Sequence, residues 1–376
     1  MEDKENFKSN IKAIIAAVVV AAILMGAFFL AKILTRPRDY TKIIASNFAA
    51  YDLARAVLGD GSKVTLLVEP GKDLHTYEPS PDDIKAIQSA DLFIYIGGES
   101  EEWVKKLTSD GQGHADGFLK LADYVGLRPE PKSLEEQVQE ESKDNQSDYY
   151  QYGSEQEYDE HIWTSMTNAI TMTHIITDRL SMLYPENSDL YYANDQKYTS
   201  KLNDIDQQFR RATMYATKHS LIFADRFPFQ YMALDHSLNY YAAFPGCSEQ
   251  TEASSQTIAT LIEKAKQEDI KVVLKTEMSS DKLAQTVASE VGAKVMVLNA
   301  AHNISREDFE SGVTYADIMT KNLEVIKEAL ETKDPYEEQY KQQLENQREY
   351  QERIEQEQQQ RLEEERKQKE EFKQQQ

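Results

Sequence analysis

The stretch VTLLVEPGKDLHTYEPSPDDIKAIQSADLFIYIGG, residues 64–98, contains the repeating unit of the fold. VTLLV is a short apolar run typical of a buried strand, and LFIYIGG is a second such run. Between them, DDIKAIQSA carries apolar residues at helical spacing. A strand, a helix and a strand of these lengths predict parallel pairing. His75 lies in the loop after the first strand, between a glycine-containing turn and a segment punctuated by prolines.

The same alternation of short strands and amphipathic helices continues on both sides of this stretch. TKIIAS precedes it, and SLIFAD, YYAAFPG, IKVVLKT and AKVMVLNA follow much later in the chain. An unusually long helical pattern, residues 188–218, separates the two groups of strands. We therefore predict an α/β fold of two lobes, residues 40–187 and 219–331, with mainly parallel sheets, joined by one long rigid helix.

Length, charge and cysteine content restrict the classes of function. The 376 residues suffice for two compact lobes with additional segments. The formal net charge of -23 argues against nucleic-acid binding, which selects basic surfaces. The single cysteine, Cys247 in FPGCS, excludes intramolecular disulfides and thiolate metal clusters, and we interpret it as a structural thiol.

Residues 13–35 form an apolar run, broken only by Lys32, that is long enough to span a bilayer. A secretory signal usually has a shorter apolar core, and no cysteine follows this run for lipid attachment. We therefore predict an uncleaved signal anchor after a cytoplasmic segment, residues 1–12. Lysines and arginines flank the run on both sides, so charge alone does not fix its orientation.

Two segments have compositions that do not suit a packed core. Residues 128–160 are acidic, polar and poor in aliphatic side chains, which predicts a mobile loop. Residues 332–376 are almost wholly Glu, Gln, Lys and Arg, with strong helix formers but without an apolar stripe. We expect this tail to be solvated and partly helical rather than a coiled coil.

Three of the seven histidines occupy loop positions where the chemistry of such a fold is expected. His75 and His302 each follow a predicted strand, and His161 lies where order returns after the acidic loop. Asp225 ends the strand SLIFAD. Ligands of doubly wound sheets bind beyond the carboxyl ends of strands, so these four side chains could form a site for a divalent ion. No short metal motif is present, and spacing alone leaves open whether they meet; His114, His174, His219 and His236 are interpreted as structural.

The sequence resembles a known family in three blocks. HTYEPSPDDIKAIQSADLFIYIGGESEEWVKKL, residues 75–107, is similar to the metal-binding receptors of zinc and manganese ABC importers, the cluster A-I solute-binding proteins. DEHIWTSMTNA, residues 159–169, resembles their Asp-Pro-His-x-Trp block, with Glu160 in place of proline. YPENSDLYYANDQKYTSKL, residues 184–202, resembles their linker helix. The resemblance covers about Lys42 to Leu330, which is the whole globular part.

The resemblance implies two α/β lobes bridged by a rigid helix, with one metal ion in the interlobe cleft. It implies His75 and His161 as the first two ligands. The third family ligand lies after the first strand of the C-terminal lobe, where this chain has Asp225. The fourth is an acid after the last strand, where this chain has His302 instead. Glu277, at another strand end, is a reserve candidate.

Three imidazoles and one carboxylate favour zinc, while manganese, which prefers more oxygen ligands, is the alternative. Each imidazole needs an acceptor for its second nitrogen, and we expect Glu78, Asp159 and Glu160 to supply these. Histidines must be neutral to bind, so metal affinity should fall in acid. A site with four protein ligands suits carriage of the ion, and we expect no enzyme activity.

The resemblance further implies a permease of an ABC importer as partner and a body outside the cell, held to the membrane by the N-terminal helix. We expect a monomeric ectodomain. Two other classes remain open from the residues. One is a zinc hydrolase with Glu78 or Glu277 as general base, which needs an open coordination position. The other is a membrane-tethered adhesion or scaffold protein with a degenerate metal site, because the third and fourth ligands depart from the family pattern.

Overall fold

The computed structural model describes residues 41–109, 111, 116–134, 137, 158–247 and 252–347, together with a few residues up to 361. The predicted signal anchor, most of the acidic loop and the end of the tail lie outside the described residues. Within the described part of the chain, no helix is both long and apolar enough to cross a membrane.

The N-terminal lobe is built on a four-stranded parallel sheet with the order β2-β1-β3-β4. Its strands are β1 (Ile43–Ala45), β2 (Val64–Leu66), β3 (Leu92–Tyr95) and β4 (Phe118–Lys120). Ile43 and Ala45 of β1 pack on the side of α2 (Phe48–Leu58), whereas Ile44 packs on the side of α3 (Pro81–Ser89). The sheet is therefore buried on both faces, as parallel sheets require.

β4 is a strand that the sequence did not predict. It has three residues, FLK, and only its middle residue, Leu119, is fully buried. It joins the sheet through Phe93 of β3, which pairs with Phe118. A strand of three residues is too short to show an alternating apolar pattern in the sequence. Its position in the sheet is set by pairing with the neighbouring strand.

The C-terminal lobe repeats this plan with the parallel order β6-β5-β7-β8. Its strands are β5 (Ser220–Phe227), β6 (Asn239–Pro245), β7 (Val272–Lys275) and β8 (Lys294–Val297). One face of the sheet is covered by α8 (Ser255–Gln267) and α9 (Asp281–Val291), and α11 (Tyr315–Ala329) packs on the other. The short helices of this lobe are α7 (Gln230–Asp235) and α10 (Arg306–Glu310). The predicted fold class is confirmed.

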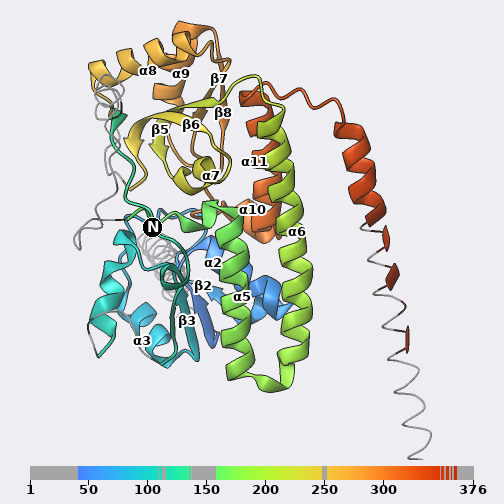
Figure 1. Ribbon diagram of the computed structural model, residues 1–376. Helices are drawn as coiled ribbons and strands as arrows, with labels where there is room; N and C mark the ends of the chain where they lie inside the picture. Colours follow the sequence, from blue (N-terminus) through green and yellow to red (C-terminus); the bar gives the residue numbers. More distant parts are fainter. Residues whose placement is uncertain are drawn as a thin grey trace, which may run out of the picture.

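Helix α6 (Ser188–Met214) runs along both lobes (Figure 1). It packs against α2 and against α5 (Met166–Leu183) on the N-terminal side and against α11 on the C-terminal side. It ends at Met214, whereas the sequence pattern extended to Lys218. The described part of the chain also contains the 3-10 helices η1 (Gly61–Lys63), η2 (Glu99–Leu107), η3 (Leu121–Tyr124), η4 (Ile162–Thr164) and η5 (Pro185–Asn187).

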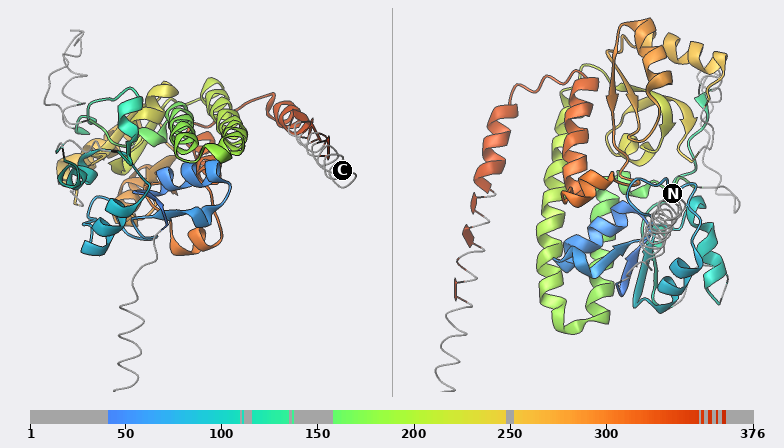
Figure 2. Two further views of the ribbon diagram at one scale, coloured as in Figure 1. Left: turned by 90° about the horizontal axis from the view of Figure 1, so that it is seen from below. Right: turned by 180° about the vertical axis from the view of Figure 1, so that it is seen from behind.

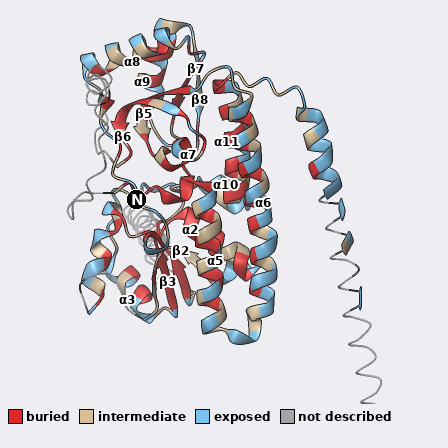
Figure 3. Cartoon of the chain, in the orientation of Figure 1, coloured by how far each residue is buried: buried red, intermediate tan, exposed pale blue. Residues whose placement is uncertain are grey.

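One continuous cluster of buried apolar side chains runs through both lobes. It includes Ile94 of β3, Phe209 of α6, and Phe223 and Leu274 of the C-terminal sheet. The inner faces of α5, α6 and α11 are buried, and their outer faces are exposed (Figure 3). The lobes are thus held together by a shared core as well as by the chain connection.

The described part of the tail, including the helical residues 337–347, leaves the globular body at the C-terminal end of α11 (Figure 2). Its start is held by an ion pair between Arg211 and Asp334, at 2.6 Å, and by a second pair between Lys327 and Glu337, at 2.9 Å. Beyond these contacts most of its described side chains are exposed.

Candidate metal centre

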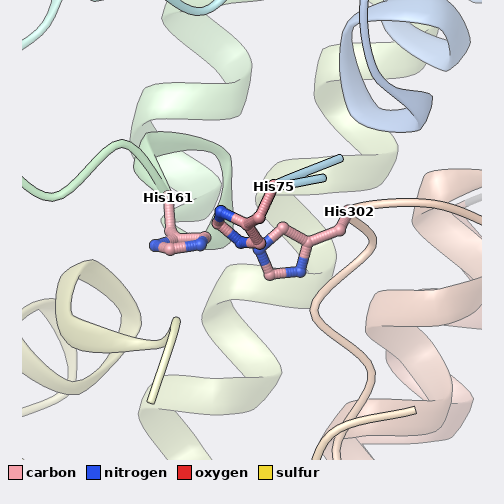
Figure 4. A group of neighbouring side chains, drawn as sticks. All are labelled: His75, His161 and His302. Atoms are coloured by element: carbon pink, nitrogen blue, oxygen red, sulfur yellow. The ribbon is translucent and has the colours of Figure 1, made fainter. Parts of the chain in front are cut away.

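His75, His161 and His302 meet between the two lobes (Figure 4). One ring nitrogen from each lies within 4.8 Å of those of the other two. The ring centroids are 5.7 Å apart for His75 and His161, 5.2 Å for His75 and His302, and 4.5 Å for His161 and His302. These side chains are more than 220 residues apart in sequence at their extremes, and only the fold brings them together.

His75 is presented by the loop between β2 and α3. Its backbone N–H donates to Asp73 Oδ1 at 3.0 Å, which turns the chain before the histidine. The same loop is fastened to the C-terminal lobe, because Gly71 donates its N–H to the carbonyl of Ile304 at 2.8 Å. Gly71 has a φ of 86°, a conformation that favours glycine. The loop is therefore held in place from both lobes.

His161 lies directly before η4 and is completely buried. Asp159 Oδ1 accepts hydrogen bonds from both the backbone N–H and ring Nδ1 of His161, at 2.9 and 2.5 Å. Asp159 is itself positioned by Tyr231, whose hydroxyl donates to the Asp159 carbonyl at 2.8 Å. With Nδ1 committed to Asp159, Nε2 is the nitrogen without a partner, and it is buried. This arrangement fixes which nitrogen remains available for a ligand.

His302 comes from the loop after β8, next to Ala301, whose φ is 53°. Its carbonyl accepts a hydrogen bond from Phe48 N, at the start of α2. The adjacent Asn303 donates from its side-chain amide to the carbonyls of Glu69 and Lys72, at 2.8 and 2.5 Å. His302 Nε2 is buried without a partner. The C-terminal ligand loop is thus bonded to the loop that carries His75.

The imidazoles are held in the neutral form that binds metal ions. Burial lowers the pKa of His75, and it lowers the pKa values of His161 and His302 well below their usual range. The other imidazoles of the group and the guanidinium of Arg226 oppose protonation further. Arg226 also faces Asp73 of the other lobe at 3.6 Å.

A cleft of about 200 Å³ leads to this group. His75 and His302 line it together with Arg226, Thr276 and Glu277. The cleft is formed by loops of both lobes at the carboxyl ends of β2, β5 and β7, where parallel sheets bind ligands. An ion could reach the histidines from this side.

Asp225 and Glu277 do not belong to the group of histidines. Among the described residues, neither carboxylate lies within 4.8 Å of all three ring nitrogens. Asp225 Oδ2 accepts hydrogen bonds from Thr276 N and Thr276 Oγ1, at 2.9 and 2.5 Å, which turn it towards β7. Glu277 Oε2 accepts from Ala300 N at 2.8 Å and so supports the loop before His302. Burial raises the pKa of Glu277 to about 7.

Of the three acids expected around the imidazoles, Asp159 and Glu160 are buried beside them. Asp159 contacts His161, and Glu160 Oε1 lies 3.5 Å from His75 Nδ1. Glu78 is exposed on the loop before α3, and no contact with the three imidazoles is described for it, so its role stays a prediction. The approach of Glu160 requires Gly98: a Cβ there would lie 2.1 Å from Glu160 Oε2.

The sequence reasoning missed Arg226 and Cys247. Arg226 directly follows Asp225 at the end of the same strand, so its position already indicated a role near the site. Cys247 was interpreted as structural, yet its sulfur lies within 4.8 Å of ligand atoms of Asp159 and His161. Of the other histidines, His174 and His236 contact Asp195 and Asp206, His219 is exposed, and His114 lies outside the described residues.

Comparison with known proteins identifies the family. The family model "Zinc-uptake complex component A periplasmic" (ZnuA) matches residues 43–329. The high-affinity zinc uptake system protein ZnuA of Bacillus subtilis is 31% identical over 293 residues, which are 78% of this chain and 88% of the relative. The zinc-binding protein AdcA of Streptococcus pyogenes is 31% identical over 290 residues, 76% of this chain, and this chain spans only 55% of its length.

A solved structure has the same fold. The Zn(II)-bound ZnuA-like domain of Streptococcus pneumoniae AdcA superposes with a TM-score of 0.62 at 29% identity, covering 78% of this chain and 99% of that domain. The family is one of zinc-uptake components and not of enzymes, which confirms the expectation that the chain is not an enzyme. The family model, the relatives and the shared fold agree, and the chain belongs to the ZnuA family of zinc-uptake complex component A proteins.

Proposed function

We propose that this protein captures Zn²⁺ outside the cytoplasm and delivers it to the permease of an ABC importer. The observation that carries the proposal is the convergence of His75, His161 and His302 within 4.8 Å. Nitrogens around a tetrahedral zinc ion lie about 3.3 Å apart, given Zn–N distances of about 2.0–2.1 Å. Because 4.8 Å is an upper limit on the distances between the ring nitrogens, shifts of at most about 1.5 Å between side chains would complete the coordination.

Three neutral imidazoles favour zinc over manganese, which prefers oxygen ligands. Asp225 and Glu277 each accept hydrogen bonds from the backbone, which hold their carboxylates towards Thr276 and Ala300. We therefore leave both carboxylates outside the ligand set and assign the fourth position to a water molecule from the cleft. The family consists of zinc-uptake components, so this open position is interpreted as the route of entry and not as a catalytic one.

Membership of the family supports the permease as partner, and the apolar run at residues 13–35 supports attachment of the body to the membrane. We further propose that this body is monomeric. The alternative of an adhesion protein with a degenerate site is not favoured, because the three imidazoles lie close enough to share one ion after small shifts. Release to the permease would require the loops of His75 and His302 to separate.

Zinc titration of the purified full-length chain tests the proposal. We expect one Zn²⁺ per chain in isothermal calorimetry, and at least about 100-fold weaker binding after His75→Ala or His161→Ala, since even outer partners of ligands contribute 10–100-fold. His174→Ala is the matched control, because His174 is half-exposed and pairs with Asp195 outside the site. Tight stoichiometric binding that survives both ligand variants would contradict the proposal.

A further inference from the structure

A second group of potential ligands shares His161 with the group of three histidines. Cys247 Sγ, a carboxylate oxygen of Asp159 and a ring nitrogen of His161 all lie within 4.8 Å of one another. Asp159 and His161 precede α5, whereas Cys247 follows β6 of the C-terminal lobe. Both Asp159 and His161 are completely buried, and Cys247 is partly buried. The group is therefore assembled from both lobes.

The carboxylates around this group have no cation to neutralise them. Asp159 Oδ2, Glu160 Oε1 and Glu130 Oε2 are buried without a hydrogen-bond partner. Among the described residues, no lysine or arginine forms an ion pair with these acids, and their only such partners are the imidazoles of His161 and His75. Buried, unpaired carboxylates are costly, and a cation among them would relieve that cost.

The backbone around Cys247 brings the thiol to these acids. Its N–H donates to Glu130 Oε1 at 2.9 Å. At the preceding Gly246, a Cβ would lie 3.0 Å from both Nδ1 and Cε1 of His161, so glycine permits the close approach. Burial, followed by the charges of Glu160, Glu130 and Asp159, raises the pKa of the Cys247 thiol. If Cys247 acted only as a small apolar side chain, its burial would be explained. The buried carboxylate oxygens without partners around it would not be explained.

We propose that Cys247 Sγ, the Asp159 carboxylate and His161 Nδ1 form a second cation position, adjacent to the three histidines, that takes a soft divalent ion such as Cd²⁺. Thiolate ligands select soft ions, and a bound metal deprotonates the thiol that coordinates it. When the ion binds, the thiol proton leaves to solvent and the proton of Nδ1 is transferred to Nε2, so that His161 coordinates through Nδ1 as a neutral imidazole. Because His161 presents Nε2 to one position and Nδ1 to the other, the two positions compete for one ring.

Cadmium titration of the purified full-length chain, followed by ultraviolet absorption, tests this position. A sulfur-to-cadmium charge-transfer band can arise only from Cys247, the single cysteine of the sequence. In the wild type an ion on the three histidines holds Nε2 of His161, so we expect the band to develop only with Cd²⁺ in excess of the first equivalent. In His302→Ala it should develop from the first equivalent. Cys247→Ser should lack the band, and Asp159→Asn should need at least about 10-fold more Cd²⁺, as expected for loss of a ligand or its partner.

Glu290→Gln is the control, since Glu290 is an exposed acid on α9 and should leave the band unchanged. A second measurement needs no variant: Cd²⁺ should slow the reaction of the Cys247 thiol with a disulfide reagent at least about 10-fold. Absence of the band at saturating Cd²⁺, or an unchanged thiol reaction rate, would overturn the second position. Neither result would alter zinc binding by the three histidines, which the calorimetric titration measures separately.

Discussion

The indole nitrogen of Trp163 donates a 2.7 Å hydrogen bond to the carbonyl oxygen of Ala300. Trp163 lies two residues after His161, and Ala300 lies two residues before His302. A single hydrogen bond between the lobes therefore links the segments that carry two of the three proposed ligands. Movement of either segment should change the surroundings of this indole.

We predict that zinc binding changes the fluorescence of Trp163. Its ring lies 5.4 Å from that of His161 and 5.3 Å from that of His302. The other tryptophan, Trp103, packs against Tyr77 and Phe93 in the N-terminal lobe. The fluorescence response to zinc should survive Trp103→Phe and disappear in Trp163→Phe. An undiminished fluorescence change in Trp163→Phe would show that zinc binding does not alter the surroundings of Trp163.

Gly98→Ala should destabilise the protein. The added Cβ would lie 2.1 Å from Glu160 Oε2 and 2.2 Å from Glu160 Cβ, so the backbone beside Glu160 must shift. Overpacking of this kind costs about 1–3 kcal/mol in the free energy of unfolding, measurable by urea denaturation. Gly126→Ala is the control, because nothing lies within 4 Å of a Cβ at that position. Equal stabilities of the two variants would contradict the close packing of Glu160.

Zinc affinity should stay constant from pH 8 to about 6.5 and fall only in more acidic solution. Protons compete with the ion at the pKa values of the folded imidazoles, which burial lowers from 6.5. The lowered pKa values of the imidazoles should also destabilise the metal-free protein in acid. The stability that they contribute is lost as the pH falls from the pKa of the unfolded state towards the lowered values of the folded state. Competition titrations with a zinc chelator across this range measure the effect. A fall in affinity that begins above pH 7 would contradict neutral, buried imidazoles.

Glu160→Gln should reduce the loss of stability that the metal-free protein suffers as the pH rises from about 5 to 9. Burial raises the pKa of Glu160 from 4.5 to about 8, so the folded state holds a proton that the unfolded state releases. A raised pKa contributes stability that is lost as pH rises through the folded value. The amide cannot ionise, and its oxygen can still accept from Ser100 N, as Glu160 Oε2 does at 3.0 Å. Urea denaturation at pH 5 and pH 9 should show a smaller difference for the variant than for the wild type.

Asp52→Ala should be the most destabilising of these changes. Asp52 Oδ2 accepts from Tyr198 Oη of α6 and Tyr315 N of α11, at 2.6 and 2.8 Å, and the carboxylate also pairs with Arg55. Removal of a buried charge that has such partners costs about 3–5 kcal/mol. The exposed Asp178, whose carboxylate accepts from Tyr192 Oη, is the control and should cost no more than about 1 kcal/mol on replacement by alanine. Comparable losses in the two variants would show that Asp52 does not join the three helices.

The fold and the three histidines could be predicted because each signal is local. Strand–helix alternation shows in short windows, and His75, His161 and His302 are recognisable from the segments around them. The position of Asp225 outside the group of histidines could not be predicted, because its carboxylate bonds to Thr276, a residue 51 positions away. The place of Cys247 beside Asp159 likewise depends on how β6 of one lobe meets the segment before α5 of the other. Contacts of this kind follow from tertiary packing, which composition and period do not encode.

Helix α6 and the core shared by the lobes hold the two halves of the site at nearly their final separation. Little additional apolar surface is then removed from water when the ion enters, and the heat-capacity change of capture should be correspondingly small. The driving force comes instead from exchanging the ion's hydration shell for imidazole nitrogens. Discrimination between cations accordingly depends on bond length and donor softness, and the same stiff body can hold different ions with little change in shape.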